Sequence, residues 1–219
     1  MKNVRAIIFD CDGTLLDSER IYLSTWELVA KPMGYDVPME VLMDNRGKGT
    51  DYCRQNLLRA MGPDFPIDEI YRIRKIKNEE VFYATENVVK DGVKEFLAWM
   101  KEHHIKGAVA SAKPCKITSE HLEHAGILGK FETIIGGDMV EHNKPEPDCF
   151  LLAAKVIGVS PEECIVVGDT PSDMKAAKAA GMRAIFVPDL VEADDEIKSL
   201  ADIIVARMDD IISILEGNI

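Results

Sequence analysis

The sequence predicts an α/β protein in which a doubly wound parallel sheet carries an all-helical segment inserted after its first strand. From about residue 92 onward, short apolar runs alternate with helical patterns, as in strands joined by crossover helices. Between the first apolar run, residues 4–9, and residue 90 the chain shows helical periodicity and no alternating strand pattern. Parallel sheets place their sites in the crevice at the carboxyl ends of the strands, so candidate residues are sought there.

The first strand is predicted at residues 4–9 because this run is short, rich in branched and aromatic side chains, and interrupted only by Arg5. Further strands are predicted at residues 107–110, 132–135, 164–167, 184–187 and 203–205. The helices between them carry apolar residues at helical spacing, for example Phe150, Ala153, Ala154 and Ile157. Four other helices are predicted. One begins at residue 93, a second ends at about residues 125–126, a third lies near residues 172–180 and the last near residues 208–215.

Residues 18–90 are predicted to form a helical insertion. Tyr22, Trp26, Val29 and Ala30 follow helical spacing, and residues 53–61 repeat it. A third helix is predicted at residues 67–83, with prolines and glycines punctuating the segment. We therefore predict two domains, an α/β core of residues 1–17 and 91–219 and a helical domain of residues 18–90.

The composition indicates a globular protein with a substantial core. Of the 219 residues 47% are hydrophobic, and no apolar run approaches the ~20 residues that cross a bilayer, so no membrane partner is expected. The first three residues lead directly into the predicted strand, so no secretory leader is expected. The five scattered cysteines form no Cys-x-x-Cys pair, which favours a reducing cytoplasm. A formal net charge of −12 disfavours nucleic acid as a partner. A monomer is the default expectation.

Asp10 and Asp12 directly follow the first strand. In extended backbone, residues two apart project to the same side, so both carboxylates are expected to face one small volume. Their repulsion is tolerable only if a cation lies between them or one acid stays protonated. Gly13 then allows a tight turn that brings the backbone close to a ligand. Considered alone, the segment also fits a polar turn after a buried strand.

Two later strands are followed by further candidate site residues. The hydroxyl of Ser111 and the amide of Ala112 can form an anion site at a strand end, although an ordinary serine helix cap is the alternative. Lys144 precedes Pro145, with a second proline two residues later, and this stiffness is unusual for a solvated surface lysine.

The strand predicted at residues 164–167 is followed by two more carboxylates. Asp169 stands at its end as Asp10 does at the end of the first strand, and so makes a natural second carboxylate for a hard cation. Asp173 has two interpretations of equal weight. It completes a helix-capping pattern with Thr170, or it belongs to the site.

The first of these segments matches the pattern Asp-x-Asp-Gly-Thr-Leu-x-Asp in full, at Asp10, Asp12, Gly13, Thr14, Leu15 and Asp17. It resembles the first motif of the haloacid dehalogenase superfamily. The other motifs of that family are matched in order by Ser111, by Lys144, and by Asp169 with Asp173, so the resemblance covers essentially the whole chain. The helical insertion resembles the small cap of the branch that includes β-phosphoglucomutase and phosphoglycolate phosphatase. The resemblance implies a Rossmann-like core with an inserted helical cap.

The resemblance also implies a reaction, hydrolysis of a small phosphorylated metabolite. In this family the first Asp attacks phosphorus, and the second protonates the leaving oxygen and then activates water against the aspartyl phosphate, roles that fall to Asp10 and Asp12. Mg²⁺ masks the charge of the carboxylate and the phosphate. Its implied ligands are Asp10, the Asp12 carbonyl and Asp169, with Asp173 as an outer residue of the metal site. The implied phosphate-binding residues are Thr14, Ser111, Ala112 and Lys144.

Three other functions stay open beside a phosphatase. A sugar-phosphate mutase of this branch typically carries an acidic residue just before the metal Asp, where this chain has Gly168, so a phosphatase is favoured. A phosphonate hydrolase needs a cap lysine for a Schiff base, and Lys48 is only a remote candidate. A non-enzymatic binding module on the same fold would have to explain why every motif residue is intact.

The loop around Arg46 and Lys48 in the helical insertion places two cations beside two glycines. We hypothesise that these cations bind an anionic or hydroxyl-rich leaving group, because caps of this branch use a loop here to contact it. A solvated turn between helices is the alternative. Two other charged features are expected to be inert, His121 and His124 on a solvated helix face and the acidic run of residues 192–196 at a helix start or loop.

Overall fold

The computed structural model describes residues 4–46, 49–190 and 192–217. The chain divides into two compact units, one made of Met1–Asp17 and Val89–Ile219 and the other of Ser18–Val88. We call the first the α/β unit and the second the helical unit. None of the helices in the described ranges is both long and apolar enough to span a membrane.

The α/β unit is built on a six-stranded sheet in the order β3-β2-β1-β4-β5-β6, with each neighbouring pair parallel. The strands are β1 (Ala6–Phe9), β2 (Lys106–Ala110), β3 (Thr133–Ile135), β4 (Cys164–Gly168), β5 (Arg183–Phe186) and β6 (Ile203–Ile204). This sheet confirms the predicted doubly wound parallel α/β fold. Phe9 of β1 pairs with Val167 of β4, so the chain leaves these two central strands at adjacent points. The strand order reverses direction between them, which is where such sheets bind ligands.

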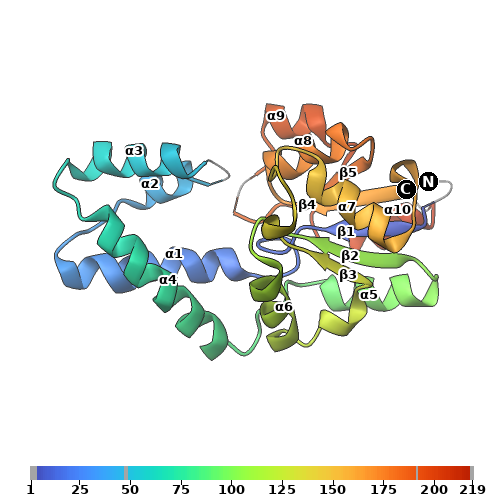
Figure 1. The fold of residues 1–219 in the computed structure, drawn as a ribbon, viewed down its shortest axis with the longest axis horizontal. Helices are drawn as coiled ribbons and strands as arrows, with labels where there is room; N and C mark the ends of the chain where they lie inside the picture. Colours follow the sequence, from blue (N-terminus) through green and yellow to red (C-terminus); the bar gives the residue numbers. More distant parts are fainter. Residues whose placement is uncertain (1–3, 47–48, 191, 218–219) are drawn as a thin grey trace. The chain divides into compact units, whose positions relative to one another are not determined.

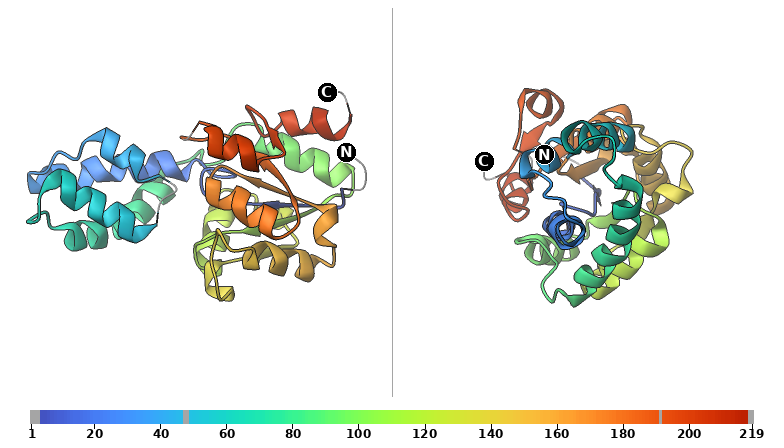
Figure 2. Two further views of the ribbon diagram at one scale, coloured as in Figure 1. Left: turned by 90° about the horizontal axis from the view of Figure 1, so that it is seen from above. Right: turned by 90° about the vertical axis from the view of Figure 1, so that its left-hand side faces the viewer.

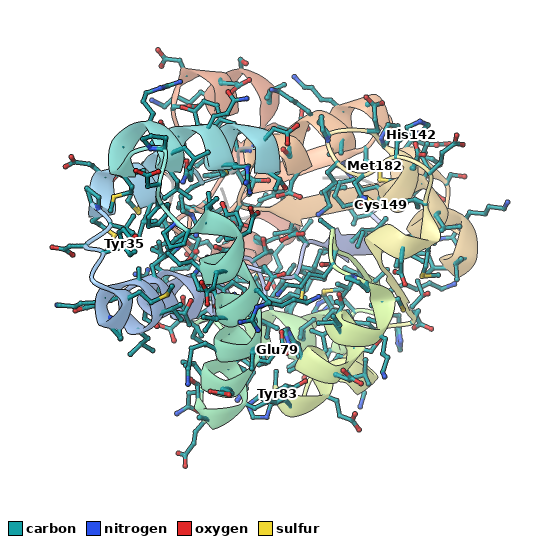
Figure 3. All side chains as sticks on the ribbon, turned by 60° about the vertical axis from the view of Figure 1, so that its left-hand side comes forward. Tyr35, Glu79, Tyr83, His142, Cys149 and Met182 are labelled. Atoms are coloured by element: carbon teal, nitrogen blue, oxygen red, sulfur yellow. The ribbon has the colours of Figure 1, made fainter. Side chains whose placement is uncertain are left out.

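Helices cover both faces of this sheet (Figures 1 and 2). Ile8 of β1 belongs to a buried cluster with residues of α7 (Asp148–Ile157) and α8 (Pro171–Ala179). Cys149 and Met182, labelled in Figure 3, belong to the same cluster. Phe9, the next residue of β1, meets Phe96 of α5 (Val93–Glu102) with ring centroids 6.0 Å apart. Because side chains alternate along a strand, a strand covered on both faces has to be apolar throughout.

The remaining α-helices of this unit are α6 (Cys115–His124), α9 (Asp195–Leu200) and α10 (Asp210–Leu215). Short 3₁₀ turns lie at Leu128–Lys130, Gly137–Met139 and Pro161–Glu163, and Lys31–Met33 forms another in the helical unit. The acidic run does contain a helix start, since the Asp194 carboxylate accepts a hydrogen bond from the amide of Ile197 at 2.8 Å.

One expectation about α6 is wrong. His124 is exposed, but His121 is fully buried and so does not lie on a solvated face. The physical reason is that α6 packs against β3, and His121 lies beside buried Leu122 within the packed part of the helix, whereas His124 is its last residue. In the described part of the chain no histidine joins a group of side chains that could hold a metal ion.

The helical unit contains α1 (Ser18–Ala30), α2 (Met39–Asp44), α3 (Thr50–Met61) and α4 (Ile67–Ala84). Its hydrophobic core includes Trp26 and Leu57, and Tyr35, labelled in Figure 3, meets Phe65 edge to face with ring centroids 5.1 Å apart. The guanidinium of Arg74 lies 3.9 Å from the centre of the Trp26 ring, and burial lowers the pKa of Arg74 to about 10. This unit therefore has a core of its own.

Leu57 and Leu28 offer a matched test of that core, because Leu57 is fully buried and Leu28 is 52% exposed in the same unit. Leu57→Ala should lower the free energy of unfolding by about 2–5 kcal/mol, since the removed groups lose their burial and leave a cavity. Leu28→Ala should change it by no more than about 0.5 kcal/mol. Urea unfolding followed by circular dichroism measures both, and equal effects would contradict the assigned packing.

Candidate active site

Lys144 bridges two carboxylates at the carboxyl edge of the sheet. The amide of Asp10 donates to the carbonyl of Val167 at 2.9 Å. This hydrogen bond continues the pairing of β1 with β4 and fixes the position of the Asp10 backbone. The Lys144 ammonium donates to Oδ1 of Asp10 at 2.5 Å and to Oδ1 of Asp173 at 2.7 Å. Its side chain is only 6% exposed, so the surface-lysine interpretation is excluded.

Asp169 is held by the turn that follows β1. The hydroxyl of Thr14 donates to Oδ1 of Asp169 at 2.7 Å, and both residues are buried. Gly13 has a φ of 79°, a conformation that favours glycine, and a Cβ at this position would lie 2.3 Å from Oδ2 of Asp169. Gly13 therefore gives the close backbone approach that the sequence predicts, and the group it approaches is a carboxylate.

Lys90 also stabilises the turn that follows β1. Its ammonium donates to the carbonyl of Gly13 at 2.5 Å and to Oδ1 of Asp189 at 2.8 Å. The side chain of Lys90 is 16% exposed and that of Asp189 is 1% exposed, so this ion pair is nearly dry. The turn is thus held on two sides by polar contacts, at Gly13 and at Thr14.

Three carboxylates form a cluster that suits a hard cation. One oxygen from each of Asp10, Asp169 and Asp173 can be chosen so that all three lie within 4.8 Å of one another, and all three residues are buried. With Lys144 charged and all three acids ionised, two negative charges would remain in this buried place, which a divalent cation would balance. Carboxylate oxygens are the ligands that Mg²⁺ prefers, so the donor set fits that ion. Asp173 supplies a member of the cluster that the sequence places only in its outer shell.

The pKa values of the cluster reflect the burial of its carboxylates close to one another. Burial raises the pKa of Asp10 to about 7, with a further rise from Asp173, although the charge of Lys144 opposes it. Burial also raises the pKa of Asp169 well above its usual range, and the neighbouring charge of Asp10 adds to this. Burial would lower the pKa of Lys144, but the carboxylates of Asp10 and Asp173 outweigh it and raise that pKa. Without a further cation the cluster therefore favours protonated acids.

Asp12 belongs to a different ion pair from Asp10. The Lys113 ammonium donates to Oδ1 of Asp12 at 2.7 Å. The two acids are expected from their spacing to face one small volume, and in the structure they form ion pairs with different lysines. Asp10 pairs with Lys144, and Asp12 pairs with Lys113. Sequence reasoning misses Lys113. The available signal is its position three residues after the end of β2, the strand that pairs with β1 in the sheet.

Ser111 is not a helix cap. Helix α6 begins at Cys115 with Pro114 before it, whereas Ser111 directly follows β2 and is buried. Its hydroxyl oxygen accepts a hydrogen bond from the amide of Lys113 at 3.1 Å. The capping alternative is therefore wrong, and the role of Ser111 and Ala112 in phosphate binding stays a prediction.

Asp173 completes the helix-capping pattern and also lies in the carboxylate cluster. The amide of Asp173 donates to the Thr170 hydroxyl at 3.2 Å, and the amide of Thr170 donates to Oδ2 of Asp173 at 3.1 Å, which is the predicted capping pattern. Oδ1 of the same carboxylate accepts from Lys144. One side chain thus begins α8 and also joins the cluster. A Cβ on Gly168 would lie 2.5 Å from the Cβ of Asp173, so this arrangement requires a glycine there.

Arg46 belongs to the helical unit. Arg46 forms an ion pair with Glu19, and its side chain is only 10% exposed. The solvated-turn interpretation therefore does not describe Arg46, and its contact with a substrate stays a prediction. Lys48, the remote candidate for a Schiff base, lies outside the described residues.

A cavity of about 440 Å³ lies at the other end of β2, lined by the first residues of that strand together with residues such as Met100 and Lys130. The carboxylates gather at the carboxyl ends of the strands, so the candidate site is not this cavity.

The raised pKa of Asp10 predicts how metal-free protein responds to pH. Between the ordinary value of 3.8 and about 7 the folded state binds more protons at Asp10 than the unfolded chain does. The stability that protonated Asp10 adds to the folded state is therefore fully present below about pH 4 and is lost as the pH rises through 7. In the presence of a chelator, the melting temperature should fall less between about pH 5 and pH 8 in Asp10→Asn than in the unmodified protein. Mg²⁺ should raise the melting temperature more at the higher pH, and identical pH profiles for the two proteins would contradict the assignment.

Comparison with known proteins agrees with this geometry. The family model of haloacid dehalogenase-like hydrolases matches residues 7–187. The chain is 31% identical over 185 residues to the phosphorylated carbohydrates phosphatase of Thermotoga maritima, covering 84% of each protein. It is 30% identical over 185 residues to the fructose-1-phosphate phosphatase YqaB of Escherichia coli strain K12, covering 83% of this chain and 95% of that protein. The solved structure of a β-phosphoglucomutase from Clostridium difficile superposes with a TM-score of 0.73 at 26% identity, over 97% of this chain and 96% of that chain.

The family match runs from within β1 to just beyond β5 and so includes the strands that carry the carboxylates and Lys144. Both relatives are phosphatases and match more than two thirds of the chain. The chain therefore belongs to the haloacid dehalogenase-like hydrolase family and is a phosphatase.

Proposed function

We propose that this phosphatase hydrolyses a small phosphorylated metabolite in a Mg²⁺-dependent reaction that passes through an aspartyl phosphate on Asp10. The observation that carries the proposal is the buried cluster of Asp10, Asp169 and Asp173 around Lys144. A carboxylate can approach a phosphate dianion only where positive charge offsets their repulsion, and this cluster gathers ligands for a divalent cation beside a fixed ammonium.

In the first step, an oxygen of Asp10 attacks phosphorus and the bond from phosphorus to the leaving oxygen breaks. Asp12 gives a proton to that oxygen, so the leaving group departs as an alcohol. In the second step Asp12 takes a proton from water, whose oxygen attacks phosphorus and releases Asp10 with inorganic phosphate. These are two displacements at one phosphorus atom, with one proton carried out and back by Asp12.

Other residues of the chain position these groups. Lys144 holds Asp10 and adds positive charge beside the transferring phosphoryl group. Lys113 holds the carboxylate of Asp12 in a separate contact. We assign Ser111 and the Ala112 amide to the phosphoryl oxygens, because they follow β2, the neighbour of β1. Mg²⁺, bound by Asp10, the Asp12 carbonyl and Asp169, would neutralise charge on the phosphoryl oxygens.

A sugar-phosphate mutase is the second candidate, since a β-phosphoglucomutase shares this fold over nearly the whole chain. The mutases of this branch typically carry an acidic side chain at the position of Gly168. Here the Cβ of such a side chain would collide with Asp173. We therefore favour hydrolysis, in which water rather than a second sugar hydroxyl accepts the phosphoryl group.

The relatives support a substrate class, since one is named a phosphorylated carbohydrates phosphatase and the other a fructose-1-phosphate phosphatase. We propose a sugar phosphate or a similarly small phosphorylated metabolite. Phosphate release with and without Mg²⁺ should be measured over sugar phosphates, phosphoglycolate, nucleotides and pyrophosphate. Products from the sugar phosphates should be analysed for isomers, because an isomerised sugar phosphate in place of free phosphate would establish the mutase.

Asp10→Asn should abolish turnover on the best substrate of this panel and leave the protein folded. The amide has the shape of the carboxylate but cannot form the acyl phosphate. Asp64→Asn, at an exposed position in the helical unit, is the matched control and should retain activity. If purified Asp10→Asn released phosphate at the unmodified rate, the covalent mechanism would be wrong.

Asp12→Asn should separate substrates by the quality of their leaving group. A sugar alcohol needs a proton as it leaves, so kcat/KM for a sugar phosphate should fall by about 10²–10⁴-fold. p-Nitrophenolate leaves without a proton, so kcat/KM for p-nitrophenyl phosphate should fall far less. Steady-state kinetics on both esters provides the measurement, and an equal loss on the two would count against Asp12 as the acid.

A further inference from the structure

Thr14 has a different partner from the one its motif suggests. The resemblance of the motif implies that Thr14 binds the phosphate of the substrate, but in the structure the Thr14 hydroxyl donates to Oδ1 of Asp169 at 2.7 Å. Thr14 is fully buried and Asp169 is 2% exposed. A hydroxyl has one hydrogen, so while it is donated to Asp169 it is not available to a phosphate oxygen.

The carboxylate of Asp169 is restrained from two sides by neighbouring residues of one turn. Thr14 binds Oδ1, and the Cα of Gly13 lies against Oδ2, since a Cβ built there would be 2.3 Å from that oxygen. Rotation of the carboxylate in either direction would break the hydrogen bond or press an oxygen against the backbone. The turn after β1 therefore fixes the orientation of a side chain that follows β4, 155 positions away in the sequence.

We propose that Thr14 is a positioning residue for the divalent cation, which it serves by holding Asp169 in the orientation that binds the ion. The inference rests on the proposed function, in which Asp169 is a metal ligand. Hydrogen bonds from neighbouring groups commonly orient the side chains that bind a metal, and their loss weakens metal affinity by about 10–100-fold. Thr14 thereby acts on metal binding through Asp169 and not on the phosphate directly.

Thr118 provides the matched control. It is also a buried threonine of the α/β unit, 1% exposed, and its hydroxyl donates at 3.2 Å to the carbonyl of Pro114, the residue just before its own helix α6. Valine has nearly the shape of threonine but lacks the hydroxyl, so Thr14→Val and Thr118→Val each remove one buried hydrogen bond. Only Thr14→Val removes one from a carboxylate of the cluster. Thr14→Ser keeps the hydroxyl and should keep the metal affinity of the unmodified protein.

The experiment measures Mg²⁺ binding directly by titration calorimetry, with Mn²⁺ followed by electron paramagnetic resonance as a second probe. We expect Thr14→Val to weaken affinity by about 10-fold or more, with Thr118→Val and Thr14→Ser close to the unmodified protein. At saturating Mg²⁺, Thr14→Val should keep the unmodified KM for substrate. Melting curves establish that each variant is folded, and Thr14→Ala replaces Thr14→Val if the latter is not.

Unchanged metal affinity in folded Thr14→Val would overturn the inference while the proposed function stood. A raised KM at saturating Mg²⁺ with unchanged metal affinity would also overturn it, and would return Thr14 to the phosphate. If the unmodified protein bound neither ion and hydrolysed no ester with Mg²⁺, both the inference and the proposed function would fail.

Discussion

The contact of Lys144 with Asp10 and Asp173 is the interaction on which the rest of the site depends. Three buried carboxylates would repel one another strongly in so small a volume, and a single ammonium offsets only part of that repulsion. The residual negative charge suits a divalent cation. In the proposed reaction that cation would permit a phosphate dianion to approach. Structure and proposed chemistry thus share one electrostatic cause.

The sheet assembles this charge from distant parts of the sequence. Adjacent parallel strands end at the same edge, so Asp10 after β1 and Asp169 after β4 meet although they lie 159 positions apart in the sequence. Glycine makes room where backbone and carboxylate would otherwise collide, at Gly13 beside Asp169 and at Gly168 beside Asp173. In this chain a side chain at either position would displace a member of the cluster, and Gly13 is the one of the two that belongs to the motif around Asp10.

Much of this could be predicted from the sequence, because strand ends can be located from apolar runs and parallel strands share an edge. That reasoning predicts the fold, which the structure confirms, and places Asp10 and Asp169 at the ends of neighbouring strands. Lys144 is singled out in the sequence by the two prolines that follow it. The same reasoning does not find the pairing of Thr14 with Asp169 or of Lys113 with Asp12, because such contacts depend on side-chain rotamers and on loop paths that no periodicity encodes. Helix α2 is missed for a related reason, since six residues are too few to show a helical period.

The stereochemical course at phosphorus is the most direct measurement of the covalent mechanism. A substrate whose transferring group is a thiophosphate made chiral with oxygen isotopes can be hydrolysed in isotopically labelled water and the configuration of the product determined. Transfer to Asp10 followed by attack of water is two displacements, each with inversion, and predicts net retention. Net inversion would mean that water attacks the substrate directly, and would contradict an aspartyl phosphate on Asp10.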